Sequence, residues 1–186
     1  MKKITILLTS AFLVAVFKVD AANADSYNYT PYVGANYTFE RANAFGVRPE
    51  HHAVGLYVGS DYSKYFSTEL FANQSGQHRN HLSDAELKTS YYNYGLDILA
   101  YLPLFAEQKF SLLATAGIGE YVYKTKFSPT DRHNEHGLGY RYGGGAKYAW
   151  NNHWQTRFIA RYVEFDKLSG YNHNMEYSLS MEYHFN

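Results

Sequence analysis

Seven charged residues are the first candidates for chemistry, because each lies in a segment of alternating residues and on its polar side. They are Glu69, Asp97, Arg141, Lys147, Arg157, Arg161 and Glu182. If these polar sides face one enclosed space, each unpaired charge would cost several kcal/mol, so the acids and bases are expected to pair. The pairs would form either a structural plug that fills the space or a narrow conduit gated by ion pairs.

Histidines are the second candidates. Seven of the nine histidines fall in four stretches without clear alternation: His51, His52, His78, His81, His133, His136 and His173. If these stretches are loops that converge, His78, His81, His133 and His136 could together bind Zn²⁺ or Cu²⁺, or take up protons in mild acid. Solvated loop residues are the alternative, since neither three-residue spacing is a specific metal motif and the chain has no cysteine.

Catalysis finds little support. Hydrolysis by a nucleophile needs a base within hydrogen-bond reach. Ser180 and His184 share a face, but it is the polar one, whereas Glu120 and Glu164 fall on the apolar side. No recognisable motif joins these residues, so the sequence favours a protein that is not an enzyme and has no cofactor.

Extended strands must position all these residues, and the end of the chain shows it most clearly. Large apolar residues at every second position, from Met175 to Phe185, alternate with Ser178, Ser180, Glu182 and His184. Successive side chains of a strand point to opposite faces, so this segment has one apolar and one polar surface. A transmembrane β-barrel requires such a strand, ending on an aromatic residue, to close its ring.

Seven further segments alternate in the same way, at 32–39, 54–59, 66–73, 92–98, 110–119, 139–148 and 157–162. Nine of the 14 glycines fall on the polar side, as expected for the crowded lumen of a small barrel. Aromatic residues gather at both ends of the apolar side, as at two membrane interfaces. The sequence therefore predicts an all-β fold, an eight-stranded antiparallel up-and-down transmembrane β-barrel. A soluble up-and-down barrel such as a lipocalin is the alternative, because alternation alone does not say which face is inside.

The links between the segments orient this barrel. Those after even-numbered segments are short (60–64, 103–108 and 151–153), and those after odd-numbered segments are longer (40–52, 74–86, 124–136 and 166–174). Transmembrane barrels of this kind have short periplasmic turns and long outer loops. We therefore expect both ends of the barrel domain in the periplasm and the histidine-bearing loops outside.

Residues 1–24 read as a signal peptide, with a basic start at Lys2 and Lys3, an apolar stretch over 4–17 and a small-residue cleavage site at Ala22 to Ala24. The barrel domain would then span 25–186. The chain has 17 basic and 17 acidic residues and no basic stripe, which argues against binding to nucleic acid.

Several stretches resemble the small eight-stranded outer-membrane β-barrels, a family that includes the transmembrane domain of outer-membrane protein A and the porin-like barrels. These stretches are 65–70, 94–104, 116–119, 143–148 and 157–162. The resemblance implies an inward charge network with Glu69, Lys147 and Arg157 as members. It also implies a terminal aromatic residue that the assembly machinery reads, although here Asn186 follows Phe185. Some related barrels modify lipid A, but the His-x-Ser-Asn motif of the deacylases is absent.

The resemblance places the protein in the cell outer membrane of a Gram-negative bacterium, reached through the inner membrane by a cleaved signal peptide. The expected role is structural or surface-interacting, in envelope integrity or adhesion. Expected partners are outer-membrane lipid and lipopolysaccharide, the outer-membrane assembly machinery and a host or other surface ligand. The alternatives are a narrow ion- or solute-conducting pore gated by the luminal network and a lipid A-modifying enzyme.

Overall fold

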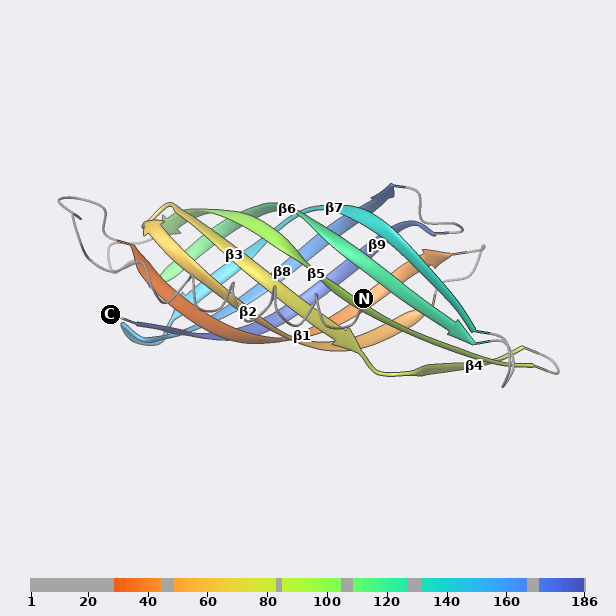
Figure 1. Ribbon diagram of the computed structural model, residues 1–186. Helices are drawn as coiled ribbons and strands as arrows, with labels where there is room; N and C mark the ends of the chain where they lie inside the picture. Colours follow the sequence, from red (N-terminus) through yellow and green to blue (C-terminus); the bar gives the residue numbers. More distant parts are fainter. Residues whose placement is uncertain are drawn as a thin grey trace, which may run out of the picture.

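The computed structural model describes residues 29–44, 49–82, 85–104, 109–126, 132–166 and 171–185, which form a barrel of antiparallel strands (Figure 1). Within these ranges no helix is long and apolar enough to cross a membrane. The predicted signal peptide lies outside the described residues. The described strands are β1 (Thr30–Ala44), β2 (Glu50–Ser63), β3 (Phe66–Ser75), β4 (His78–Leu82), β5 (Ala85–Leu104), β6 (Phe110–Lys126), β7 (Arg132–Ala149), β8 (Trp154–Asp166) and β9 (Tyr171–His184).

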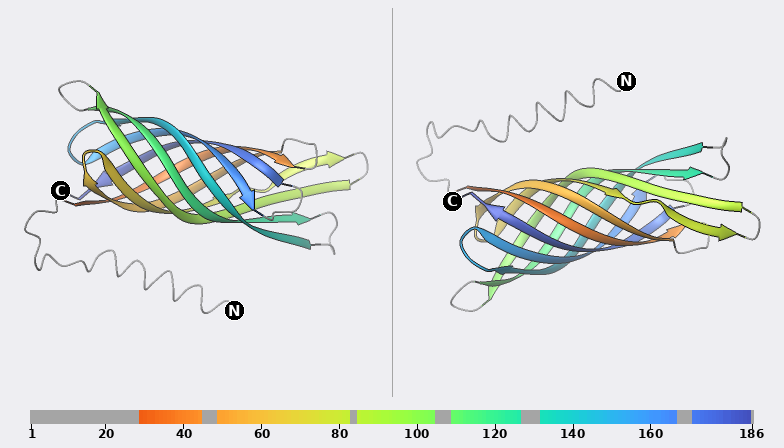
Figure 2. Two further views of the ribbon diagram at one scale, coloured as in Figure 1. Left: turned by 90° about the horizontal axis from the view of Figure 1, so that it is seen from above. Right: turned by 90° about the horizontal axis from the view of Figure 1, so that it is seen from below.

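The ring closes between the first and last strands, because β1 pairs with both β2 and β9. β3 and β4 both pair with β5, one after the other along its length. They therefore occupy a single strand position in the ring, and we call each such position a stave. The barrel therefore has eight staves, as predicted from the alternation. Figure 2 shows the barrel from two opposite sides, with its strands tilted relative to the barrel axis.

The tilt is measured by moving from each residue to its register partner on the next strand, once around the ring. Starting at Thr156 on β8, this path returns to β8 at Asp166, so the shear is ten residues (166 − 156). The residues on this path, in order, are Thr156, Met181, Ala35, Leu56, Ala72, Tyr94, Glu120, Leu138 and Asp166. Strand tilt and stagger are linked in any closed barrel, so this shear determines which inward side chains share a depth.

The two faces of the strands follow the predicted parity. On β9, Leu179 is 56% exposed and Met181 50%, whereas the intervening Ser180 is buried. Aromatic side chains also form a belt at each end of the apolar face. Around the end with short turns, Trp154 contacts Tyr183, and Tyr183 contacts Phe185. Towards the other end, Tyr142 contacts Tyr162.

Glycines make room for aromatic rings in the lumen. Gly34 lies opposite Tyr57, and Gly59 lies opposite Tyr32. A Cβ atom at Gly34 would overlap the Tyr57 ring, and one at Gly59 would stand 2.5 Å from Cζ of Tyr32. Each ring therefore lies across the position that a side chain on the neighbouring strand would occupy. This reciprocal packing accounts for glycines on the inner face.

The predicted outer loops are shorter than expected, because strands continue into them. The link predicted at 74–86 contains β4, and β5 begins at Ala85; the end bearing this hairpin is opposite the C-terminus (Figure 1). All seven histidines predicted in loops lie in strands instead: His51 and His52 in β2, His78 and His81 in β4, His133 and His136 in β7, and His173 in β9. Beyond the bilayer neither strand face needs to be apolar, so no alternation marked these extensions.

Candidate functional site

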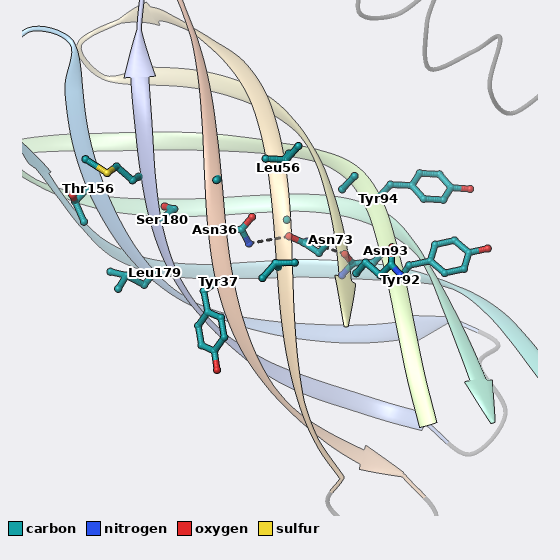
Figure 3. Close-up of a pocket in the computed structure, with 16 residues that line it drawn as sticks. Asn36, Tyr37, Leu56, Asn73, Tyr92, Asn93, Tyr94, Thr156, Leu179 and Ser180 are labelled. Carbon is teal, nitrogen blue, oxygen red and sulfur yellow. Dashed lines mark hydrogen bonds between the residues drawn. The ribbon is translucent and has the colours of Figure 1, made fainter. Parts of the chain in front are cut away.

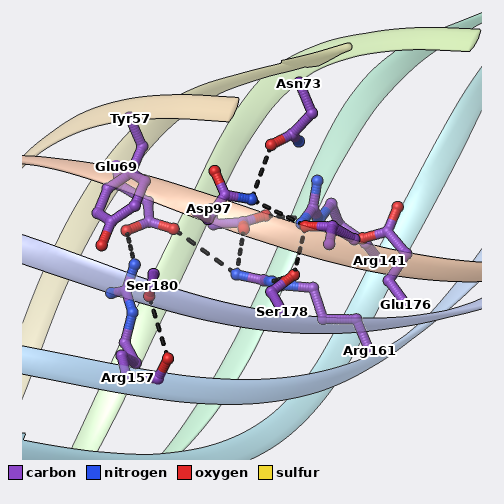
Figure 4. A network of polar contacts seen from close by, with 12 residues as sticks. Tyr57, Glu69, Asn73, Asp97, Arg141, Arg157, Arg161, Glu176, Ser178 and Ser180 are labelled. Carbon is purple, nitrogen blue, oxygen red and sulfur yellow. Dashed lines mark hydrogen bonds and ion pairs between the residues drawn. The ribbon is translucent and has the colours of Figure 1, made fainter. Parts of the chain in front are cut away.

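Seven buried side chains form a line of alternating charge through the lumen, and Figure 4 shows the part of it from Arg157 to Glu176. In order they are Glu182, Arg157, Glu69, Arg161, Asp97, Arg141 and Glu176. Five strands contribute: β3 carries Glu69, β5 carries Asp97, β7 carries Arg141, β8 carries the other two arginines, and β9 carries the other two glutamates. We call this set the luminal charge line. Each arginine lies between two carboxylates.

The distances in the luminal charge line are those of close ion pairs. Nη2 of Arg157 lies 2.7 Å from Oε2 of Glu69, and its Nη1 lies 3.6 Å from Oε2 of Glu182. Nη2 of Arg161 lies 3.1 Å from Oδ2 of Asp97 and 3.6 Å from Oε1 of Glu69. Because the side chain of Arg157 is only 2% exposed, these charges are compensated by each other rather than by solvent.

The line continues through Arg141 towards the outer half of the barrel. Nε of Arg141 lies 3.2 Å from Oδ1 of Asp97, and Nη2 lies 3.3 Å from Oε2 of Glu176. The Arg141 guanidinium also lies over the ring of Phe71, with Cζ 3.8 Å from the ring centroid. A planar guanidinium can pair with two carboxylates at its edge and stack an aromatic ring on its face, which fixes its orientation.

Six of the seven predicted luminal residues belong to this line. Lys147 is the register partner of Arg157, beside the line, and its ammonium group lies over an aromatic ring. Its Nζ is 3.9 Å from the centre of the Tyr101 ring. The sequence reading missed Glu176, which has the inward parity of β9 and could have been found by counting back from Ser178. Glu40 is also buried in the lumen, although the sequence predicts the start of a loop there; it lies in β1 instead.

A histidine closes the line at the end with short turns. The buried ring of His184 stacks on Tyr32, with ring centroids 4.9 Å apart. Its Nε2 lies 3.2 Å from Oε1 of Glu182, and its Nδ1 lies 3.4 Å from Oδ2 of Asp61. Ser180 does not join this histidine, since its hydroxyl donates to the backbone carbonyl of Arg157 at 3.2 Å. The Ser180–His184 pair on the luminal face is therefore not arranged as a nucleophile and base.

An aromatic layer fills the lumen at the outer end. Tyr121 donates to Oε1 of Glu176 at 2.8 Å, and Tyr123 donates to Oε1 of Glu40 at 2.7 Å. Asn174 donates to the same Glu40 oxygen at 2.6 Å. The tyrosines pack with buried Val163 and other apolar residues in one cluster. The charge line is thus covered on both sides along the axis, by this layer and by His184.

The predicted metal site is only partly within the described side chains. The side chain of His136 is exposed, and its Nδ1 lies 3.3 Å from Oε1 of Glu120, whose Oε2 accepts a hydrogen bond from Tyr94. The side chains of His78, His81 and His133 lie outside the described part. Among the described side chains, no group of three or more histidines, cysteines and carboxylates is arranged to hold a metal ion. Zinc binding by the four histidines stays a prediction.

Comparisons with known proteins agree with this geometry. The model of the outer membrane protein β-barrel domain family matches residues 9–185. A search of curated proteins found no match. Among solved structures, the crystal structure of Neisserial surface protein A is similar, with a TM-score of 0.72, 12% identity and coverage of 85% of this chain and 99% of that one.

Two other solved structures share the fold. Ail of Yersinia pestis, crystallised in complex with the heparin analogue sucrose octasulfate, has a TM-score of 0.61 and 14% identity, with coverage of 85% of this chain and 99% of that one. A major outer membrane protein from Thermus thermophilus has a TM-score of 0.63 and 11% identity, with coverage of 86% and 100%. At these identities the likeness concerns the fold alone.

Proposed function

We propose, from the premise that this chain belongs to the outer membrane protein β-barrel domain family, that it is a closed, non-catalytic barrel with a structural role in the integrity of the outer membrane. The luminal charge line carries this proposal. A conduit needs continuous space along its axis, whereas here Arg157 and Arg141 are 2% and 3% exposed and each is fixed between carboxylates. In a barrel of eight staves, side chains of this size fill the interior.

Reconstitution in planar lipid bilayers tests whether the lumen is closed. We expect no steady conductance from the wild-type barrel. The double variant Glu69→Ser with Arg157→Ser removes the closest pair of the line and replaces two long side chains with small polar ones, so it is expected to open a measurable water-filled path. Steady wild-type current, altered by the double variant, would instead establish the gated conduit.

The integrity role needs a test in cells. A strain without the gene should become more sensitive to detergent, and expression of the wild-type protein should restore resistance. Unchanged sensitivity would contradict this role. Phe185 follows directly after β9 and is 45% exposed; it is proposed as the aromatic residue that the assembly machinery reads.

A second candidate, surface interaction, is favoured by one register row in the sheet beyond the bilayer. The row crosses β4, β5, β6 and β7 and consists of four basic residues, Arg79, Lys88, Lys126 and Arg132. Neighbouring strands lie about 4.8 Å apart, so the row spans roughly 14 Å. A row of like charges is repulsive unless an anion compensates it. We propose a polysaccharide with repeated sulfate or phosphate groups as the ligand; the heparin analogue sucrose octasulfate, with which Ail was crystallised, is a small compound with repeated sulfate groups.

Titration calorimetry with sucrose octasulfate tests this second candidate. The double variant Arg79→Ala with Lys126→Ala should weaken binding at least about tenfold, which corresponds to ~1.4 kcal/mol. Lys64→Ala with Lys109→Ala removes the same charge at the end with short turns and should leave affinity unchanged. Equal weakening by both double variants would show that binding depends on net charge and not on the row.

A further inference from the structure

A broad hollow of about 900 Å³ lies on the outward face of the barrel, across β8, β9, β1, β2, β3 and β5 (Figure 3). Its floor is aliphatic, with Leu56 between two alanines, Ala35 and Ala72, in one row. Its sides are higher, with Tyr37 and Leu179 on one side and the rings of Tyr92 and Tyr94 on the other, all of which line it. Its volume is within the ~300–1,000 Å³ typical of small-molecule sites.

Two large apolar side chains in the hollow are more exposed than those elsewhere on the outward face of the described strands. Val54 and Leu56 are each 66% exposed, the highest fractions among the large apolar side chains of the described residues. Their exposure follows from their neighbours, since Leu56 is paired with an alanine on each side. The protein lies in the outer membrane, so the apolar face between the two aromatic belts contacts lipid, and hydrocarbon must cover this hollow.

Polar groups stand at both ends of the hollow, and a basic group lies beside the outer end. At the end near the short turns, Thr156 accepts a hydrogen bond from Trp150, which belongs to the aromatic belt. At the opposite end, Gln74 and Tyr92 line the hollow, and Nζ of exposed Lys124 lies 4.9 Å from the Tyr92 ring centroid. Short turns are periplasmic in barrels of this family, so Lys124 marks the outer leaflet.

We propose that this hollow binds lipopolysaccharide, with an acyl chain over Ala35, Leu56 and Ala72 and a lipid A phosphate at Lys124. The aliphatic floor matches the acyl chain, and the ammonium group matches the phosphate. Because Lys124 lies in the outer leaflet, the site faces lipopolysaccharide and not the phospholipids of the inner leaflet. A second copy of the barrel is the competing occupant, but it would present no phosphate to Lys124. The site is independent of whether the lumen conducts.

Native mass spectrometry of the full barrel in detergent, with bisphosphorylated hexa-acylated lipid A as the probe, tests the site. Ala35→Trp and Ala72→Trp fill the hollow and should each reduce lipid A retention about tenfold or more. Ala116→Trp is the matched control, because Ala116 is an outward alanine on β6 that does not line the hollow; it should retain lipid A as the wild type does. Heat-modifiable migration in gels verifies that each variant is folded.

The contact between Lys124 and a lipid A phosphate is tested separately, with phosphorylated and dephosphorylated lipid A. Lys124→Ala should weaken retention of bisphosphorylated lipid A but leave retention of the dephosphorylated form unchanged. Three results would overturn the proposal: undiminished lipid A on the two hollow-filling variants, equal wild-type retention of phosphatidylethanolamine, or a wild-type dimer that Ala72→Trp converts to monomers. The last of these would assign the hollow to a second copy.

Discussion

Replacement of Arg157 by alanine is expected to destabilise the folded barrel by about 3–5 kcal/mol. Arg157 is the side chain of the luminal charge line placed between Glu69 and Glu182, at 2.7 Å and 3.6 Å. Its removal leaves these two carboxylates buried, Glu182 with Nε2 of His184 at 3.2 Å and the Tyr57 hydroxyl at 3.1 Å but no guanidinium beside it. It also removes a guanidinium that lies over the Tyr57 ring, with Cζ 4.8 Å from the centroid. Urea unfolding in detergent micelles, followed by tryptophan fluorescence, measures the loss.

An exposed ion pair of nearly the same length provides the control. Nη2 of Arg41 lies 2.8 Å from Oε1 of Glu50, but the two side chains are 52% and 44% exposed. Arg41→Ala should therefore cost only about 0–1 kcal/mol. Adding Glu69→Gln to Arg157→Ala removes one stranded charge and should recover part of the loss. Equal destabilisation by Arg157→Ala and Arg41→Ala would mean that burial does not determine the strength of these pairs.

The face of each residue was predictable from the sequence, because strand parity needs no knowledge of the fold. Counting alternate positions placed Glu69, Asp97 and Arg161 inside before any strand pairing was known, and the structure buries all three. Phe158 and Leu179 were assigned to the lipid face by the same count, and both are about half exposed. Two solvents of opposite polarity on the two faces make this pattern unusually strong.

Depth and pairing were not predictable, because they depend on shear. Glu69 and Arg157 are 88 residues apart in the chain and meet across the lumen only because of the stagger between staves. Parity says that both point inward but not that they lie at one level. The strand extensions escaped prediction for a different reason. Around His78 and His133 polar residues occupy both faces, so the backbone is extended without an alternating pattern.

A charge at the middle of the lipid face gives the second large effect: Phe158→Arg is expected to cost about 2–4 kcal/mol of folding free energy in a bilayer. Phe158 lies on β8 midway between Trp154, which contacts Tyr183 in one aromatic belt, and Tyr162, which contacts Tyr142 in the other. Its side chain is 49% exposed on the face that contacts lipid. Folding into vesicles of defined phospholipid, followed by heat-modifiable migration and urea titration, measures the cost.

Glu164→Arg makes the depth dependence testable on the same face of the same strand. Glu164 is exposed beyond Tyr162, towards the outer end of β8, and an arginine there can reach water and lipid headgroups. Its expected cost is about 0–1 kcal/mol. The two variants should have the same free energy in the unfolded chain, because neither residue then lies at a fixed depth in the bilayer. If Phe158→Arg folds into vesicles as readily as Glu164→Arg, this face of β8 does not contact the hydrocarbon of the bilayer. The assignment of apolar side chains to the lipid face would then fail at β8, a strand that contributes an aromatic residue to both belts.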